Sequence, residues 1–516
     1  MEAKARRRYA PYLMVGIVLL AFALRVYHID FQSLWRDEVD ALRFATRPLS
    51  DLIATFRNPG ENGPLYFLLL RGWLAAVGRS EFALRSLPLL AGVLAVPLSF
   101  ALGQRLIGSR PALLGTMLVA TSPYLVWYSQ EAKMYALAVS LVLAALCSFS
   151  AALAGKGWTR WLLTWLFTTL AIYVHLLSVL LIVVLVCWFA VEWLQRPAAR
   201  RHTGPMLLVL ALLTLPYLPI VRWQLVLWLQ ESFQTGHAVV SPTTMLASLL
   251  WGFSRGVQGS GSLWTLLPTV FVLLAGAALG WGRNGGGVRE SADANEEAPS
   301  RPRVLQAAVK DHLPQFSVVR LLLWLVLPVL GLYIISLRKP LFTDRYLIWI
   351  APAFYLLLAR GMWEMGKRWR LLAVVLGTVL LALNLQALWS QAHTIIKSDF
   401  RAASAFVEER QAPEDLLLFV MPYVRHPYSY YSGQPLSWAD PPYTNSGATE
   451  AEVDVEMSRI TDNHPVVWLI QSEEDAWDRR SLARAWLDEH GALNESAEFV
   501  RVQVARYDLT TAKDTP

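Results

Sequence analysis

The chain has 516 residues, of which 55% are hydrophobic and 16% are charged, and its mean hydropathy is +0.38. The apolar residues form long runs with no recurring polar face, such as "LLSVLLIVVLVCWFAVEWL" at 176–194. A soluble domain shows apolar stripes or alternation instead, so the composition excludes that class and indicates a polytopic membrane protein. The formal charge is +7. Basic residues beside membrane spans determine the orientation of the spans, so this charge does not imply a nucleic-acid partner.

The apolar runs predict the membrane spans. The N-terminal run follows a basic stretch and lacks a small-x-small cleavage site, so we expect a retained span rather than a signal peptide. We expect an all-α polytopic module of about 11 to 13 transmembrane helices within residues 1–390. The runs long enough to cross the bilayer lie at 10–27, 84–106, 110–128, 132–154, 158–175, 176–195, 204–221, 263–281, 319–337, 344–362 and 370–388.

One further apolar run, at 64–77, is short for a span and carries Arg71 in its middle. The basic clusters of the chain mark the cytoplasmic ends of spans if the positive-inside rule holds. The spans then alternate without contradiction only if 64–77 does not cross, so we expect a re-entrant or interfacial helix there. The first loop (28–83), the loop 222–262 and the C-terminal tail would lie on the outer face.

An acidic pair lies in the first of these outer loops, where "SLWRDEVDA" at 33–41 sets Asp37 beside Glu38. Carboxylates at this position are often solvated loop residues, but Trp35 flanks the pair. A carboxylate that is partly desolvated beside an aromatic ring has a raised pKa, as a general base requires. We therefore expect Asp37 to take the proton of an incoming hydroxyl, with Glu38 orienting it or helping to hold a metal ion.

Two cations open later spans on the expected outer side, Lys133 in "SQEAKMYAL" and Arg345 in "FTDRYLIWIAP". Snorkelling at the interface is the simpler explanation of a lone cation at a helix end. Each of these cations, however, has an acidic residue and a tyrosine close by in the sequence. A phosphate needs such cations, Arg as a bidentate donor and Lys as a point charge. We expect a phosphate site here, with Arg71 as a further cation and with Glu131, Asp344 and Tyr346 as supporting residues.

His175 lies between two apolar runs, in "AIYVHLLSV". A single histidine in such a place is more often a hydrogen-bonded turn residue than a ligand or an acid/base. We keep it as a supporting residue of the site.

The composition changes twice outside the spans. Residues 282–318 are rich in glycine and charge, so we expect a flexible cytoplasmic loop. Residues 391–516 predict an extracytoplasmic α/β domain of about 120 residues, a common domain size. Its expected elements are a helix and a strand in "DFRAASAFVEERQAPEDLLLFV", a buried strand in "HPVVWLI", a helix in "RRSLARAWLDEH" that Gly491 caps, and an alternating strand in "EFVRVQVARYDL".

Five motifs, taken in order, resemble the bacterial membrane glycosyltransferases related to dolichyl-phosphate-mannose protein mannosyltransferases and to lipid A aminoarabinose transferases, which form part of the GT-C superfamily. The resemblance covers roughly the first 390 residues. The motifs are "SLWRDE", "NGPLYFLLLRGWLAAVGRSEFALRSLPLLAGVLAVPL", "SPYLVWYSQEAKMYAL", "YVHLLSVLL" and "DRYLIWIAP".

The resemblance implies a GT-C fold in the inner (plasma) membrane, a sugar on polyprenyl phosphate as donor, and inverting transfer on the outer face. It assigns the base role to Asp37 with Glu38 beside it, and it places the lipid phosphate near Lys133 and Arg345. The family usually carries His-Pro-Pro before Leu-Tyr, where this chain has Asn62, Gly63 and Pro64 before Leu65 and Tyr66. Asn62 is able to hydrogen-bond but not to act as an acid or base, so it does not replace the usual histidine in such a role.

The sequence leaves several alternatives open. A flippase or transporter of lipid-linked sugars is the main competing class, although polar residues spread through the depth of several spans would be expected for it. Within the enzyme class, the acceptor could be a protein, a lipid or a polysaccharide, and the sugar is not indicated. The acidic pair could hold Mg²⁺ or Mn²⁺, but hard cations generally want more oxygen ligands.

Overall fold

The computed structural model describes residues 2–55, 63–155, 157–230, 238–257, 262–281, 301–433, 435, 437–444, 447–474 and 478–510. These residues form two compact units. The helical unit comprises Met1–Tyr27, Arg47–Gly78 and Ala83–Ala392, and the mixed unit comprises His28–Thr46, Arg79–Phe82 and His393–Pro516. Each unit is described by itself.

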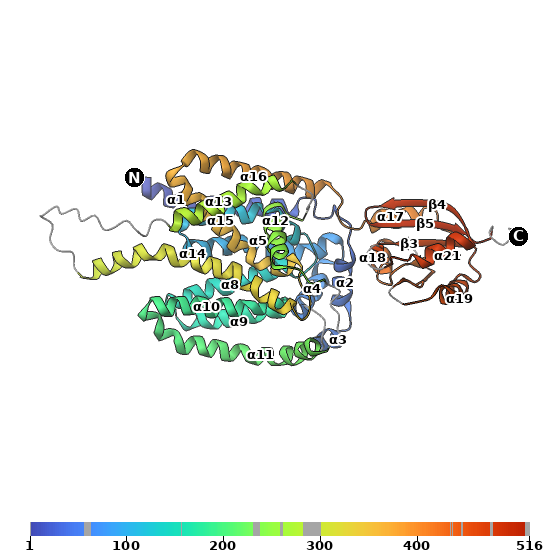
Figure 1. Cartoon of the computed structure of the whole chain (residues 1–516), viewed down its shortest axis with the longest axis horizontal. Helices are drawn as coiled ribbons and strands as arrows, with labels where there is room; N and C mark the ends of the chain where they lie inside the picture. Colours follow the sequence, from blue (N-terminus) through green and yellow to red (C-terminus); the bar gives the residue numbers. More distant parts are fainter. Residues whose placement is uncertain are drawn as a thin grey trace. The chain divides into compact units, whose positions relative to one another are not determined.

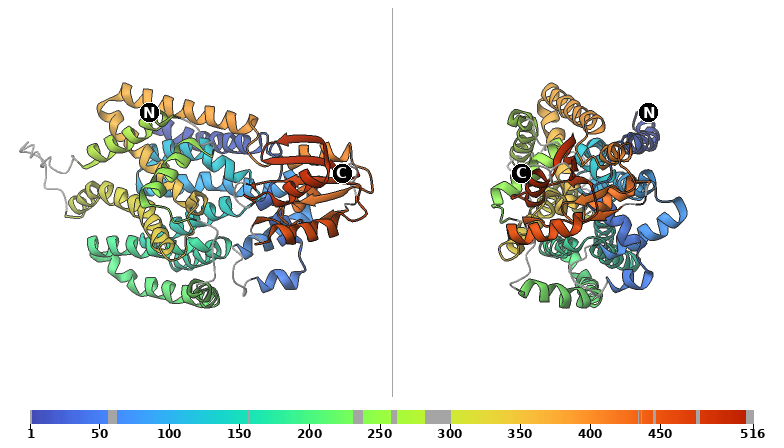
Figure 2. Two further views of the ribbon diagram at one scale, coloured as in Figure 1. Left: turned by 45° about the vertical axis from the view of Figure 1, so that its right-hand side comes forward. Right: turned by 90° about the vertical axis from the view of Figure 1, so that its right-hand side faces the viewer.

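Most long helices of the helical unit run side by side (Figures 1 and 2). Apolar runs favour helices in lipid because a helix satisfies its own backbone hydrogen bonds. The elements of this unit are α1 (Glu2–Val26), α3 (Leu49–Ala54), α4 (Pro64–Val77), α5 (Glu81–Leu106), α6 (Ser109–Thr121), α7 (Pro123–Ser129), α8 (Tyr135–Leu153), α9 (Trp158–Val174), η1 (Leu176–Val179), α10 (Leu180–Gln195), η2 (Pro197–His202), α11 (Thr203–Leu229), α12 (Pro242–Arg255), η3 (Leu263–Leu266), α13 (Leu267–Trp281), α14 (Arg301–Ser336), η5 (Asp344–Ile350), α15 (Ala351–Arg368) and α16 (Arg370–His393).

The helices confirm the expected membrane fold. Among the described residues, six helices are long and apolar enough to cross a membrane, and shorter apolar helices lie at Tyr12–Val26, Pro64–Val77 and Leu263–Leu279. The other expected spans coincide with α6 followed by α7, with α9, and with the first part of α11. The run 64–77 forms α4 with the same bounds. The chain is thus a multi-pass, mostly helical membrane protein.

Two expected loops are more helical than predicted. Residues 301–318 belong to α14, whereas 282–300 lie outside the described residues. The loop expected at 222–262 contains the end of α11 and all of α12. A Ser-Pro start explains α12, because Ser241 accepts from the N–H of Thr244 and Pro242 occupies the first helical position.

Helices α13 and α15 pack with their backbones in contact. A Cβ at Gly276 would lie 2.4 Å from the Cα of Gly361, and a Cβ at Gly361 would lie 2.7 Å from the carbonyl oxygen of Val272. Only glycine fits at both positions. Small residues of this kind allow close helix packing where lipid supplies no hydrophobic drive.

The mixed unit contains a five-stranded sheet in the order β2-β1-β3-β5-β4. Strand β1 is parallel to β2 and β3, while β5 is antiparallel to β3 and β4. The strands are β1 (Leu416–Phe419), β2 (Trp438–Ala439), β3 (Val466–Gln471), β4 (Ala492–Phe499) and β5 (Val502–Asp508), and the helices are α2 (Arg36–Thr46), α17 (Phe400–Glu408), α18 (Arg425–Tyr431), α19 (Glu450–Thr461) and α21 (Leu482–His490).

The sheet buries all four residues of β1 and nearly all of β3, as their unbroken apolar sequences predict. The predicted helix and strand at the start of the tail, the strand in "HPVVWLI" and the helix in "RRSLARAWLDEH" are confirmed as α17, β1, β3 and α21. The prediction of a single strand in "EFVRVQVARYDL" is wrong. The first two residues of this segment end β4, and the chain turns at Arg501, which has a φ of +58°. Apolar and polar residues alternate on both sides of the turn, so the sequence pattern resembled that of one continuous strand.

Candidate active site

The acidic pair begins a helix. Asp37 and Glu38 occupy the first turn of α2, where the exposed N–H groups and the helix dipole favour negative charge. The side chains diverge in their surroundings, since Asp37 is half-buried and Glu38 is fully buried. Two carboxylates that are adjacent in sequence thus have different environments, which suits different roles.

Glu38 forms a buried ion pair with Lys397. The Lys397 Nζ lies 2.7 Å from Glu38 Oε2, and the two side chains are 5% and 0% exposed. The same ammonium lies 5.9 Å from the centroid of the Trp35 ring. A buried carboxylate requires such a partner, because desolvation strongly disfavours an isolated charge. Lys397 gave no signal in the sequence, since it lies 359 residues from Glu38.

The segment just before α2 is hydrogen-bonded to the start of the C-terminal tail. Gln32 donates through Nε2 to the carbonyl of Thr394 (2.8 Å) and accepts through Oε1 from the N–H groups of Ile396 (2.9 Å) and Lys397 (3.2 Å). Ser33 donates to the carbonyl of Ser398 (2.9 Å). These bonds fix the backbone on both sides of the Glu38–Lys397 pair, so the acidic loop and the tail form one structure.

Tyr431 anchors the same loop from α18. Its hydroxyl accepts from the N–H of Leu34 (2.6 Å) and donates to Glu81, which also pairs with Arg401 at 2.5 Å. Burial and the neighbouring Glu81 carboxylate raise the pKa of Tyr431. The phenol therefore stays protonated at neutral pH and remains a hydrogen-bond donor.

A second polar cluster lies in the helical unit. His175 lies between α9 and η1 with its ring 6.0 Å from that of Tyr135 and 5.6 Å from that of Tyr346. The Arg345 guanidinium lies 5.7 Å from the centroid of the Tyr135 ring. The structure therefore brings together three motifs that the sequence placed on one face, namely 129–135, His175 and 343–346.

His175 is 1% exposed, and neither ring nitrogen has a hydrogen-bond partner among the described residues. A buried imidazole without a partner is costly. The expected turn hydrogen bond is thus not seen for the side chain. An oxygen-rich ligand beside Arg345 would supply the missing partner.

Gly63 stands at the middle position of the usual His-Pro-Pro. It has a φ of +86° at the start of α4, and a Cβ there would lie 2.6 Å from Met134 Cε and 2.7 Å from the carbonyl oxygen of Val174. These two neighbours adjoin Lys133 and His175. The glycine therefore lets the start of α4 pack directly against the second polar cluster.

The remaining predicted residues have varied surroundings. Arg71 donates through Nη1 to the carbonyl of Arg47 (2.6 Å). Tyr66 is fully buried, with its ring edge-on to Phe67. Lys133 is partly exposed and Glu131 is buried. Asn62 lies outside the described residues.

The sequence analysis missed one side of this cluster, where Tyr124 of α7 approaches Asp344. Gly252 of α12 makes room for both, because a Cβ there would lie 3.1 Å from the Tyr124 ring and 3.5 Å from Asp344 Oδ2. The Tyr124 ring also packs edge-on against Tyr128 and Phe253. A tyrosine in an aromatic belt carries no sequence mark that distinguishes it from a site residue.

The acidic pair does not fit a two-carboxylate metal site. The Glu38 carboxylate is buried against Lys397, which supplies the positive charge that a cation would otherwise supply. Among the described residues, no group of three or more His, Cys, Asp or Glu side chains is placed to hold a metal ion. Asp37 alone would offer a hard cation too few oxygen ligands.

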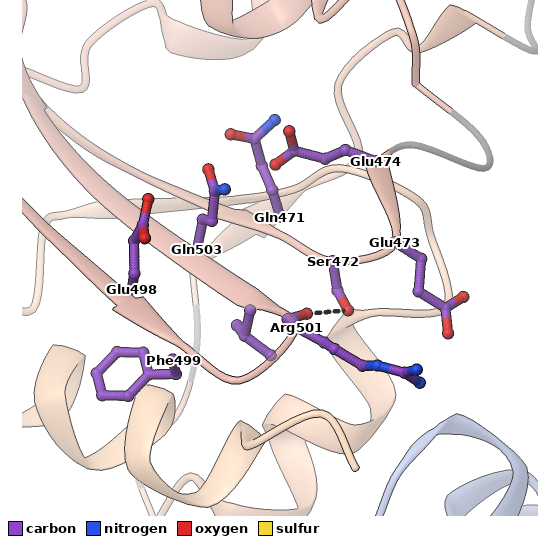
Figure 3. A pocket seen from close by; sticks show the side chains of 9 residues that line it. Gln471, Ser472, Glu473, Glu474, Glu498, Phe499, Arg501 and Gln503 are labelled. Atoms are coloured by element: carbon purple, nitrogen blue, oxygen red, sulfur yellow. Dashed lines mark hydrogen bonds between the residues drawn. The ribbon is translucent and has the colours of Figure 1, made fainter. Parts of the chain in front are cut away.

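A polar hollow of about 570 Å³ opens where β3 ends (Figure 3). Gln471, Gln503 and Glu498 stand opposite one another on β3, β5 and β4, and Figure 3 shows their side chains on the same side of the strands. Gln471 is 1% exposed, and its Nε2 has no hydrogen-bond partner among the described residues. Amides and carboxylates exchange hydrogen bonds readily with hydroxyl groups, whereas the carboxylates disfavour an anionic ligand.

Part of the helical unit matches a known family. Residues 61–223 match the model of the family described as dolichyl-phosphate-mannose-protein mannosyltransferase. This match covers three of the five motifs that carry the resemblance in the sequence. Comparison with curated protein sequences gives no match.

Solved structures show the same fold at low sequence identity. The chain is similar to ArnT from Cupriavidus metallidurans bound to undecaprenyl phosphate, with a TM-score of 0.58, 13% identity, and coverage of 96% of this chain and 97% of that one. It is also similar to the oligosaccharyltransferase AglB from Archaeoglobus fulgidus in complex with an inhibitory peptide and a dolichol-phosphate. For that structure the TM-score is 0.55, the identity is 11%, and the coverage is 99% of this chain and 75% of that one. Another structure of the Archaeoglobus fulgidus oligosaccharyltransferase holds Zn and sulfate.

Proposed function

We propose that this enzyme transfers a sugar from a polyprenyl-phosphate donor to an acceptor hydroxyl at the outer face of the membrane, with inversion at the anomeric carbon. Asp37 takes the proton of the acceptor hydroxyl. The acceptor oxygen bonds to the anomeric carbon while the bond from that carbon to the phosphate oxygen breaks, and polyprenyl phosphate leaves with the electron pair. The donor assignment is supported by the similar structures of ArnT bound to undecaprenyl phosphate and of AglB in complex with a dolichol-phosphate.

The observation that carries the proposal is that the two adjacent carboxylates differ in burial and in ion pairing. Lys397 neutralises Glu38 and holds it inside the mixed unit, whereas Asp37 at the same helix start is half-buried. A general base needs a fixed position and an accessible carboxylate. Glu38 thus orients α2, and Asp37 performs the proton transfer.

The departing phosphate requires positive charge, because its negative charge grows in the transition state. Arg345 and Lys133 are the cations proposed for it, and Arg345 lies beside His175 and Tyr135. Hydrogen bonding of the donor to the buried His175 would satisfy ring nitrogens that have no hydrogen-bond partner in the described part of the chain. The proposed role of Arg71 at the same phosphate stays a prediction.

The test of the base is Asp37→Asn in the full-length enzyme, assayed with a polyprenyl-phosphate sugar donor. Loss of general-base catalysis should lower kcat by about 10²- to 10⁴-fold while donor binding and folding are retained. The matched control is Asp40→Asn, one turn further along α2, where the carboxylate pairs with Arg43 at 3.2 Å. Near-normal turnover by the Asp37 variant, or an equal loss in both variants, would reject the assignment.

The test of the phosphate site is Arg345→Ala and Lys133→Ala, with Arg338→Ala as the control cation. Arg338 is an exposed residue whose Nε donates to the carbonyl of Trp228. Removing a phosphate-binding cation should raise KM for the donor about tenfold or more. Unchanged donor kinetics in both site variants would leave the phosphate at another position. Mass spectrometry of glycans, glycoproteins and lipids from a strain that lacks the enzyme would identify the sugar and the acceptor together.

A further inference from the structure

A groove of about 700 Å³ lies along α6, α15 and α16 of the helical unit, and none of its lining residues belongs to the candidate site. Its walls are mostly apolar and include Met117 and Leu118 of α6 and Val374 and Leu381 of α16. An apolar channel on a membrane helix bundle suits an acyl chain, and its surroundings decide which lipid it selects.

One end of the groove is basic. Arg110 begins α6, Lys367 ends α15 and Arg370 begins α16, and all three line the groove and are exposed. No Asp or Glu is among the described residues that line it. Lys367 contacts Glu364, at 2.8 Å from both carboxylate oxygens, but the two arginines leave the groove end positive. A cluster of cations beside an apolar channel is the arrangement that binds an anionic lipid head group.

Small residues make the groove hollow. A Cβ at Gly366 would lie 3.5 Å from the Cβ of Ala373, and a Cβ at Gly377 would lie 3.7 Å from Met362 Sδ. Both are ordinary contact distances, so alanine would fit at either glycine. Larger side chains at these positions would fill the channel.

The length of the groove matches one leaflet. From Arg370 to Leu381, helix α16 rises about 16 Å, and both residues line the groove. That is about half of the roughly 30 Å hydrocarbon core. A lipid with its phosphate at the basic end would therefore end its acyl chain near the bilayer midplane.

We propose that this groove binds one anionic glycerophospholipid. Arg110, Lys367 and Arg370 hold its phosphate, and one acyl chain lies against Met117, Val374 and Leu381. The basic clusters of the chain predict that this end faces the cytoplasm, so the lipid belongs to the inner leaflet. This site is independent of the proposed transfer reaction.

The test uses the purified full-length enzyme in detergent and native mass spectrometry after addition of palmitoyl-oleoyl phosphatidylglycerol or the matching phosphatidylcholine. The wild type should retain one phosphatidylglycerol in preference to phosphatidylcholine. The variant R110Q/K367Q/R370Q should weaken that binding by at least about tenfold. The control R160Q/R200Q/R201Q removes three exposed cations elsewhere, in α9 and η2, and should bind like the wild type.

A second variant tests the acyl channel with all charges in place. Gly377→Leu should reduce retention of phosphatidylglycerol to the level of phosphatidylcholine, and an unchanged thermal midpoint in lipid-free detergent would show that the protein remains folded. Equal binding of the two lipids by the wild type would overturn the proposal. So would equal losses in the site and control triple variants, full retention by Gly377→Leu, or displacement of phosphatidylglycerol by equimolar undecaprenyl phosphate.

Discussion

Replacing Lys397 by methionine would leave the Glu38 carboxylate buried without its partner. The ion pair joins atoms 2.7 Å apart in side chains that are at most 5% exposed. At an effective dielectric constant of about 20 their attraction is about 6 kcal/mol, which is similar to the several kcal/mol that desolvation costs for each ion. The pair therefore contributes little net stability, but loss of one partner should cost about 3–5 kcal/mol.

We expect this cost to appear as local opening of α2, because the pair links that helix to the start of the tail. Hydrogen–deuterium exchange of α2 peptides measures such opening, and 3 kcal/mol corresponds to an increase in exchange rate of about a hundredfold. Turnover should fall in parallel, since Asp37 shares the first turn of α2.

Two further variants separate loss of the pair from loss of packing. Lys397→Arg keeps the charge and should retain most of the protection, while Glu38→Gln combined with Lys397→Met removes both charges and should recover much of it. If the single and double variants exchange equally fast, or if Lys397→Met changes exchange less than threefold, the pair does not hold the acidic loop and the reasoning fails.

Three further perturbations test other parts of the structure. Gly63→Ala should lower the thermal midpoint more than Gly78→Ala, because both glycines have a positive φ but only Gly63 has atoms within 3 Å of the added Cβ; equal shifts would contradict the close contact. Tyr431→Phe should cost about 1–3 kcal/mol, seen as faster exchange near Leu34, whose N–H loses its acceptor. Burial and two neighbouring arginines lower the pKa of His426 from 6.5 to about 4, so the unfolded chain binds more protons between these values. Stability should therefore fall as the pH drops from about 6.5 toward 4, and His426→Gln should flatten that part of a pH series of thermal midpoints.

The sequence predicts the helical unit well because a bilayer leaves the chain few choices. An apolar run of about 20 residues must satisfy its backbone internally, and even the short run 64–77 forms a helix with the predicted bounds. The error at 498–509 has the opposite origin. Apolar and polar residues alternate in a hairpin as they do in a single strand. The turn at Arg501 contains no glycine, proline or asparagine that would predict it from the sequence.

The sequence allowed residues to be grouped by membrane face, but it gave no sign of contacts between segments that are far apart in the chain. The grouping of His175 with Tyr135 and Arg345 followed from topology, because helix ends on one side of a membrane converge. Lys397 could not be found in this way, since it lies in an ordinary stretch of the tail and acquires meaning only through a contact across 359 residues. Pair contacts of that separation require the tertiary structure.

The union of the acidic loop with the C-terminal tail also sets an order of events during synthesis. A ribosome adds about 5–20 residues per second, so Glu38 is made roughly 20 to 70 seconds before Lys397 reaches it. A nascent or prematurely terminated chain that ends before residue 397 thus has every helix from α1 to α16 but lacks the lysine that pairs with Glu38. The buried ion pair therefore forms only after the membrane helices α1 to α16 have been synthesised.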